Sequence, residues 1–298
     1  MPPTDKRAVK SYCAHTQHLA NQIGEKDRKL FILKNKDCVG YHLNKRTLSL
    51  LDPLFGNQNT WLTVGDYNGL EAQYLQEHGQ SAMASDISGI FLQAALNENL
   101  IEAYSVENVE YLSFKEDSFE YVFCRHAFHH FPRAFLGLYE MVRVCKKGTI
   151  LIEPLDILSK MPLLLWLKNI TDLIHPHLIN TIWKNRFSWE TVGNYVFKIS
   201  EREIEKIAMG INLPCIAFRG INVLLDIKED LTTVPTDLKL LKKLNRKLKF
   251  RDFFCKIRFI PYNALCSMLF KETPNPKELE ILRKAGYKII HLPGNPYL

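Results

Sequence analysis

The sequence predicts an α/β protein with a doubly wound, mostly parallel sheet of seven strands. Two observations carry this prediction. Apolar runs with little polar alternation recur along the chain, as in FEYVFC at 119–124, and such runs are typical of strands buried inside a parallel sheet. Helical patterns alternate with these runs between residues 60 and 152, which favours strand–helix–strand units.

Local signals set the ends of several elements. Gly79 is expected just past a helix over 70–78, and Ser88 is expected to N-cap a helix that ends near residue 97. Ser200 is the expected cap of a helix over 201–209, and Pro276 suits the first position of a helix over 276–285. The other strand-like segments are 60–64, 82–85, 101–105, 149–152, 215–218, 267–270 and 287–292, and the other helical ones are 134–144 and 238–249.

The change in residue composition along the chain predicts how it divides into domains. Residues 1–55 are polar and helix-prone and are expected to form a helical N-terminal cap. Residues 56–298 are expected to form the sheet domain, with helical insertions at 155–200 and 225–262. The first insertion follows the fifth strand, where it can roof a substrate pocket.

Composition limits the class of protein. The formal net charge of +7 mildly favours anionic partners. The seven cysteines are scattered, without a C-x-x-C pair, so we expect neither a disulfide framework nor a metal site. The polar N-terminus does not resemble a signal peptide, and the longest apolar run, 161–167, is too short to span a bilayer. We therefore expect a reduced, cytoplasmic protein.

The stretch VGDYNG, residues 64–69, indicates a cofactor loop. It follows a strand and precedes a helix, where backbone N–H groups and glycines let a nucleotide approach. Asp86 ends the next strand, 21 residues after Gly65, at the position of a carboxylate that binds ribose hydroxyls. The alternative on these features alone is a plain turn, with Asp86 as a helix-capping residue.

Four stretches resemble the class I S-adenosylmethionine-dependent methyltransferases, which have a Rossmann-like fold. They lie within residues 55–156 and read VGDYNG, ASDIS, ENVEYLSFKEDSFEYVFCRHAFHHF and YEMVRVCKKGTILIEP. The resemblance implies S-adenosyl-L-methionine as cofactor. The cofactor-binding residues that it implies are Gly65, Asp66, Asn68, Gly69, Asp86, Ile87, Asn108, Val109 and Cys124.

Four positions depart from the family pattern. Thr63 replaces an acidic residue, Asp66 a small residue, Tyr67 the middle glycine, and Asn108 an aspartate that faces the adenine amino group. Asn108 can still accept a hydrogen bond through its amide oxygen. Tyr67 leaves two readings open: a rebuilt cofactor loop, or a non-catalytic binding protein on a degenerate methyltransferase fold.

His126 and His129 are the candidate catalytic bases. They follow the fourth strand, and histidine titrates near neutrality. His130 and Phe131 are expected to serve packing or helix entry, and a purely structural role for all three histidines is the alternative. The absence of an Asn-Pro-Pro-Tyr-type motif after this strand favours O-methylation, and we expect a hydroxyl of a sugar or related metabolite as acceptor.

The flanking segments leave the partners open. The basic helix near 238–249 and the apolar run MPLLLWL fit either packing within the protein or contact with an anionic membrane surface or lipid-linked acceptor. The basic helix lacks interleaved aromatic residues before Phe250, so nucleic acid is not favoured. A nicotinamide-dependent dehydrogenase is the enzymatic rival, but the chain lacks G-x-G-x-x-G and, in its sheet half, a Tyr-x-x-x-Lys pair. The sequence gives no indication of oligomeric state.

Overall fold

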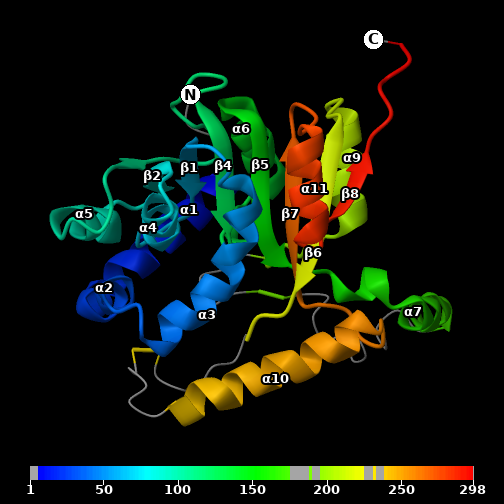
Figure 1. The fold of residues 1–298 in the computed structure, drawn as a ribbon, viewed down its shortest axis with the longest axis horizontal. Coiled ribbons are helices and arrows are strands. Elements are labelled where there is room, and N and C mark those ends of the chain that lie inside the picture. Colours follow the sequence, from blue (N-terminus) through cyan, green and yellow to red (C-terminus); the bar gives the residue numbers. More distant parts are fainter. Residues whose placement is uncertain (1–5, 175–187, 190–194, 225–230, 233–237, 298) are drawn as a thin grey trace.

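A computed structural model describes residues 6–174, 188–189, 195–224, 231–232 and 238–297. One eight-stranded sheet, in the order β3-β2-β1-β4-β5-β7-β6-β8, forms the centre of the molecule (Figure 1). The strands are β1 (Thr60–Val64), β2 (Ser81–Asp86), β3 (Tyr104–Val106), β4 (Phe119–Arg125), β5 (Cys145–Pro154), β6 (Cys215–Ile221), β7 (Ala264–Phe270) and β8 (Lys288–His291).

Helices join and cover these strands. The α-helices are α1 (Lys6–Asn21), α2 (Lys26–Lys34), α3 (Val39–Leu48), α4 (Leu70–Glu77), α5 (Ile90–Asn97), α6 (Ala134–Val144), α7 (Pro162–Ile174), α9 (Glu201–Gly210), α10 (Leu238–Lys256) and α11 (Pro276–Lys284). Short 3₁₀ helices are η1 (Ile23–Glu25), η2 (Ser49–Leu54), η3 (Phe128–His130) and η4 (Ile157–Lys160).

The predicted doubly wound, mostly parallel sheet is confirmed, but its strand number is not. Strands β1 to β5 pair in parallel. Strand β7 then runs antiparallel to both β5 and β6, and β8 runs antiparallel to β6. The sheet has eight strands rather than seven, because all eight strand-like segments join it, including the one at 287–292, which forms β8 and pairs with β6 from Cys215 to Phe218.

Two further expectations needed correction. Ser88 is not the N-cap of α5: the cap is Gly89, and the Ser88 backbone N–H donates to Asp86 Oδ1 instead. The third strand begins at Tyr104 rather than near residue 101, because its register pairs Tyr104 with Ala84. The expected cap of α9 is confirmed, since Ser200 and Glu203 form a reciprocal capping box.

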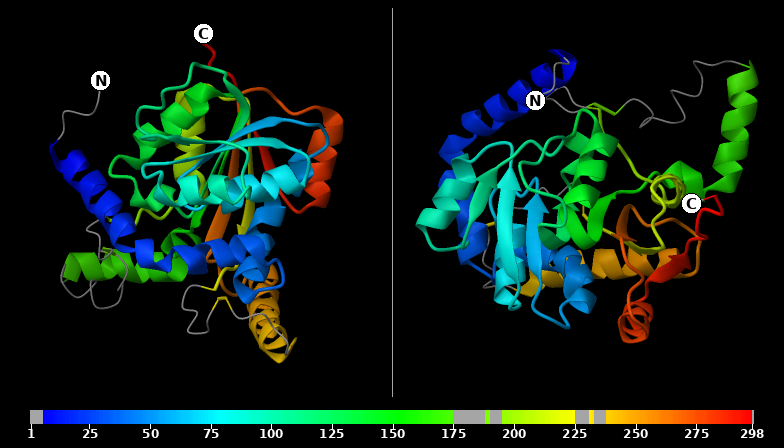
Figure 2. Two further views of the ribbon diagram at one scale, coloured as in Figure 1. Left: turned by 90° about the vertical axis from the view of Figure 1, so that its left-hand side faces the viewer. Right: turned by 90° about the horizontal axis from the view of Figure 1, so that it is seen from above.

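Each face of the sheet buries its own hydrophobic core. Neighbouring residues on one strand point to opposite faces, so Trp61 packs in one core and Leu62 in the other. The first core includes side chains of α2, α4, α5 and α11, and the second includes side chains of α6 and α9. Figure 2 shows the resulting layers of helices on both sides of the sheet.

The expected basic helix exists and extends beyond its predicted end. Leu241, Leu244 and Leu248 are buried along one face of α10, three or four residues apart, so they dock the helix. Helices α7 and α10 lie within the predicted insertions 155–200 and 225–262, parts of which fall outside the described residues. The domain limits 1–55 and 56–298 stay predictions. Within the described ranges, no helix is long and apolar enough to cross a membrane.

Candidate active site

The site lies where the parallel strands end. Because β1, β2, β4 and β5 run in one direction, the residues that follow them meet at one edge of the sheet. Gly65 follows β1, Asp86 ends β2, His126 follows β4, and Glu153 lies near the end of β5.

Gly65 brings the turns after β1 and β4 into close contact. Its φ of +70° lies in the left-handed region, and a Cβ at this position would come within 2.2 Å of the Ala127 Cβ. Only glycine fits both the backbone conformation and this space. The turn therefore exposes bare backbone at the edge of a cavity, as a close-lying ligand requires.

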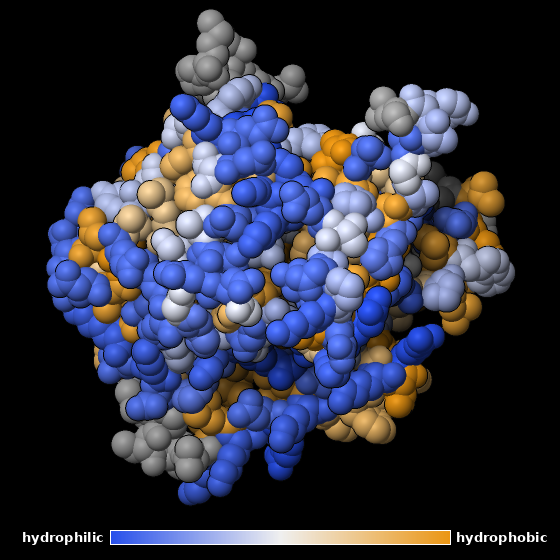
Figure 3. All heavy atoms as spheres, turned by 45° about the horizontal axis from the view of Figure 1, so that its top comes forward, coloured by the Kyte–Doolittle hydropathy of each residue, from blue (hydrophilic) through white to orange (hydrophobic). Residues whose placement is uncertain are grey.

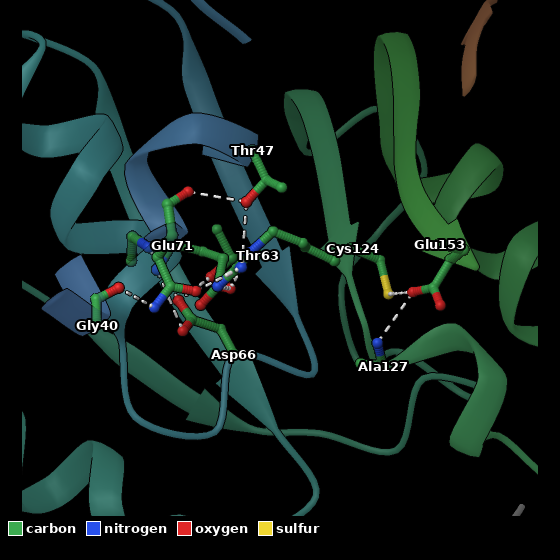
Figure 4. Close-up of polar contacts among 11 residues, drawn as sticks. Gly40, Thr47, Thr63, Asp66, Glu71, Cys124, Ala127 and Glu153 are labelled. Carbon is green, nitrogen blue, oxygen red and sulfur yellow. Dashed lines mark hydrogen bonds and ion pairs between the residues drawn. The ribbon is translucent and has the colours of Figure 1, made fainter. Parts of the chain in front are cut away.

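Asp66 faces the protein interior rather than the cavity (Figure 4). Its Oδ2 accepts hydrogen bonds from Thr63 Oγ1 and the Ala72 N–H, both at 2.9 Å, and its Oδ1 accepts one from the Glu71 N–H. Both N–H groups belong to the first turn of α4, where backbone N–H groups have no acceptor inside the helix. Burial, together with the charge of Glu71, raises the pKa of Asp66. Asp66 thus stabilises the loop in which it replaces a small residue.

Asp86 lines the cavity next to Gly65. The Asp86 side chain is buried, its Oδ1 accepts the Ser88 N–H at 2.9 Å, and burial raises its pKa to about 7. Hydrogen bonds from ligand hydroxyl groups would favour the ionised form that burial disfavours. A ribose diol supplies such donors.

Asn108 and Val109 are the two expected binding residues at the adenine end of the cofactor site, and of the two only Val109 lines the cavity. Asn108 is held by its own backbone: its Oδ1 accepts the Glu110 N–H at 3.0 Å, and its carbonyl accepts the Tyr111 N–H at 2.8 Å. Glu107 also lines the cavity, with its carboxylate bonded to Ser105 and Ser113.

Glu153 holds the turn after β4 in place (Figure 4). Its Oε1 accepts the N–H groups of Ala127 and Phe128 at 2.9 and 3.0 Å, and its Oε2 lies 2.6 Å from His129 Nδ1. Burial raises its pKa, but His129, His126 and the backbone N–H groups that it accepts from together outweigh burial and keep the pKa below its usual range. Glu153 is therefore an ionised carboxylate, and its hydrogen bonds hold Ala127, Phe128 and His129 in place.

His126 occupies the most constrained position of this turn. Its φ is +53°, which is uncommon for a residue with a side chain, and its N–H donates to the Ile152 carbonyl at 3.0 Å. Burial, assisted by the charge of Arg125, lowers the His126 pKa to about 4. The imidazole is therefore neutral at pH 7.

Two cavities meet at His126. The first, of about 170 Å³, is lined by five of the residues expected from the sequence, Gly65, Asp86, Ile87, Val109 and His126. The second, of about 230 Å³, is lined by His126 and by residues of α3, of α10 and of the segments around β4 and β6. His126 thus lies between the two cavities.

The other expected site residues lie outside both linings. Asn68 and Cys124 are buried, Gly69 precedes α4 with φ +83°, and His129 is buried against Glu153. Asp66 and Asn108 make the loop contacts described above. The residues of the first cavity that the sequence did not indicate as binding residues are Ser11, Tyr12, His15, Val64, Tyr67, Ser85, Glu107, Ala127, His130 and Phe131.

Three of these residues, Ser11, Tyr12 and His15, come from α1, about 50 residues before the cofactor loop in the chain. No local motif marks them, because they reach the cavity only through packing. His130 and Phe131 do have a signal, the HHF segment after β4, which was read as packing or helix entry.

Tyr67 shares the first cavity without blocking the turn. Its ring packs edge-on against Phe91, with centroids 6.0 Å apart, and Lys29 Nζ lies 5.2 Å from its ring centroid. The ring forms part of the wall in a loop where smaller residues are usual.

Comparisons with known proteins agree with this geometry. Residues 62–152 match the model of a methyltransferase domain, whereas no curated protein matches the chain significantly. One similar solved structure is a chain of the complex between the Haloferax volcanii Trm112 methyltransferase activator and a protein assigned as a methyltransferase, with TM-score 0.50, 14% identity, and coverage of 85% of this chain and 97% of that one.

A second is a protein from Thermotoga maritima assigned as an S-adenosylmethionine-dependent methyltransferase, with TM-score 0.50, 10% identity, and coverage of 88% and 100%. At such identities these likenesses show the fold. The domain match shows that residues 62–152 are similar to a methyltransferase domain, and the chain shares the fold of the two solved structures.

Proposed function

We propose that this protein methylates a hydroxyl of a sugar or related small metabolite. The acceptor would bind in the 230 Å³ cavity, next to the cofactor cavity. One observation carries the proposal: His126 lines both cavities. Gly65, Asp86 and Val109 are the residues that would hold the cofactor. When bound, S-adenosylmethionine supplies a methyl group already activated by the positive sulfonium centre.

The protein contributes alignment and a proton acceptor. Alignment of two bound reactants supplies much of the rate of such a displacement. His126 is neutral at pH 7, so its imidazole can take the hydroxyl proton. Glu153 and the Ile152 carbonyl hold the backbone around His126 and so fix its position. His129 is the weaker candidate, because it is buried against Glu153 and lines neither cavity.

The lining of the acceptor cavity favours a hydroxylated ligand. Asn44 and Thr47 line it beside apolar side chains such as Leu43 and Val223. Both polar side chains already bond within the protein, and their oxygens each have a second lone pair that a ligand hydroxyl could use.

Two cations of this cavity already have partners. Arg125 pairs with Glu71 and bonds Asn44 Oδ1 at 2.8 Å, and Arg46 pairs with Asp252 at 2.6 Å. Paired cations can donate hydrogen bonds to hydroxyl oxygens without demanding a charged ligand. A lipid-linked form of the same acceptor would present the same hydroxyl.

A second candidate is a binding protein that retains the fold without catalysis. The observation that favours it is Tyr67, whose ring takes up part of the cofactor cavity wall. Such a protein would either not bind the cofactor or bind it without transferring the methyl group.

Calorimetric titration with S-adenosylmethionine and S-adenosylhomocysteine separates these candidates, with NAD as a control ligand. We expect both sulfur nucleotides to bind and Asp86→Ala to weaken them about 100-fold, because two hydrogen bonds to a charged group contribute about 3 kcal/mol. Asp27→Ala, an exposed aspartate in the first turn of α2, is the matched control and should bind normally. A folded protein that binds neither nucleotide would refute cofactor binding.

A further inference from the structure

Helix α7 carries exposed apolar side chains in the part of the chain that the structure describes. Five consecutive residues, Leu163 to Leu167, are all exposed, with Leu163 at 69% and Trp166 at 58%. Leu173 near the end of the helix is 87% exposed. A run of exposed apolar residues all around a helix is unusual on a water-soluble surface and marks an interaction site.

Helix α10 carries a second exposed apolar cluster at its C-terminal end. Its leucines dock the helix inward, so they do not account for the aromatic residues that follow. Phe250 is 67% exposed and Phe259 is 73% exposed, and Phe253 and Ile257 are exposed beside them. Phe254 contacts three of these rings, with centroids 4.9 to 5.7 Å apart.

Exposed cationic side chains run along α10 and continue beyond the aromatic cluster at its C-terminal end. Eight cationic side chains are exposed on or just after α10: Lys239, Lys242, Lys243, Arg246, Lys247, Lys249, Lys256 and Arg258. Asp252 is the acidic residue of this helix, and it is paired with Arg46. Apolar side chains set among cations complement an anionic bilayer, whose head groups attract the cations while the apolar groups enter the interface.

The two helices lie at the same end of the molecule. Figures 1 and 2 show α7 and α10 beyond the carboxyl ends of the parallel strands. Figure 3 shows hydrophobic and hydrophilic side chains mixed over the face of the molecule that is turned toward the viewer. Leu248 of α10 also lines the second cavity, so this surface adjoins the acceptor site.

We propose that α7 and α10 form a docking surface for an anionic lipid bilayer. The leucines and Trp166 of α7 and the phenylalanines of α10 insert at the interface, and the lysines and arginines of α10 contact the anionic head groups. Docking would bring the second cavity close to the membrane surface. This inference does not depend on methyl transfer, because lipid binding is measured without cofactor or acceptor.

Flotation of the full chain with unilamellar vesicles tests the proposal. One vesicle set is phosphatidylcholine alone, and the other contains about one-third phosphatidylserine, an anionic lipid. We expect binding to the anionic vesicles, at least tenfold weaker binding to the neutral ones, and a fall in binding as salt rises. Absence of binding to anionic vesicles at low salt would overturn the proposal.

Variants separate the two contributions. Leu163→Asp with Trp166→Asp removes the apolar contact of α7, and Lys242→Glu with Lys247→Glu reverses two charges of α10. Each pair should weaken vesicle binding at least tenfold. All four residues are exposed, so the thermal melting of the variants should match the wild type.

The matched control is Met209→Asp with Lys284→Glu, which changes two exposed residues on α9 and α11. It should bind vesicles as the wild type does. Equal binding by the wild type and both docking variants would overturn the proposal. So would a wild type that forms dimers instead of binding vesicles and that becomes monomeric in the α7 variant, since the surface would then be a protein interface.

Discussion

The two halves of the sheet each contain buried strands, such as β1 and β7, but their polar groups differ in what they contact. In the parallel half, β1 to β5, the residues at the strand ends line two cavities. In the antiparallel half, all seven residues of β7 are buried, and the Tyr287 hydroxyl next to β8 donates a hydrogen bond within the fold, to the Leu50 carbonyl at 2.7 Å. Parallel strands place all their carboxyl ends at one edge, whereas antiparallel strands send alternate ends to opposite edges. Strand direction therefore decides which strand ends reach the cavities, and β6, which runs in the same direction as β5, also places Asn222 at the second cavity.

His126→Ala should have the largest effect of these changes, because it alters the residue at the strand ends of the parallel half that lines both cavities. We expect kcat to fall about 10²–10⁴-fold, the usual contribution of a general base, with unchanged affinity for S-adenosylhomocysteine. Transfer of a tritiated methyl group to a panel of sugars and sugar derivatives gives the assay.

His291→Ala, at the end of β8 in the antiparallel half, is the control for this variant and should retain full turnover. If His126→Ala stays active while His129→Ala is inactive at unchanged stability, the base is His129. Because the pKa of His126 is about 4, the wild-type kcat at saturating S-adenosylmethionine should also stay level between pH 8 and 6.

Gly65→Ala tests the close contact between the turns after β1 and β4. The matched control is Gly79→Ala, because Gly79 has a similar φ of +74° but no atom within 4 Å of the added Cβ. Both changes should cost about 1 kcal/mol for the left-handed backbone. Gly65→Ala should cost about 2 kcal/mol more, because its Cβ would overlap Ala127.

Urea unfolding measures both costs. The double variant with Ala127→Gly should recover most of the extra loss, because it removes the overlapping Cβ. Equal destabilisation by the two single variants would show that crowding at Gly65 has no energetic consequence.

The pKa of Asp86 predicts a pH dependence of cofactor binding. Burial raises this pKa to about 7, so at lower pH the carboxyl group carries a proton that must leave before the carboxylate accepts ligand hydroxyls. Affinity for S-adenosylhomocysteine should therefore rise about tenfold from pH 6 to pH 8, with close to one proton released per ligand at pH 6. Calorimetry in buffers of different ionisation enthalpy measures the proton release, and Asp86→Asn should abolish it. A pH-independent wild type would contradict an ionising Asp86 at the ligand.

Ser267→Ala should have the smallest effect and comes from the antiparallel half. The buried Ser267 Oγ has no hydrogen-bond partner among the described residues. Its removal should leave stability unchanged or raise it by up to about 1 kcal/mol, because the hydroxyl was desolvated without a bond in return. Thermal melting measures this, and a clear loss of stability would indicate that the hydroxyl does have a partner.

The sequence by itself determined the elements that depend on local patterns. The ends of β1 and α6 were predicted to the residue, and Asp86 and Gly65 were identified from their spacing. These features follow from periodicity and turn chemistry, which neighbouring residues settle among themselves. The prediction that Asp86 binds ligand hydroxyls likewise rested on a local feature, its position at the end of a strand.

Only the tertiary structure decided what each candidate side chain faces. Asp66 and Asn108 belong to the predicted motifs, yet local backbone N–H groups hold their side chains away from the cavity. Ser11 and Tyr12 reach the cavity from a helix whose position depends on packing across the sheet. The position of His126 between two cavities depends on Glu153, 27 residues further along the chain, and such long-range contacts are not encoded in any short stretch of sequence.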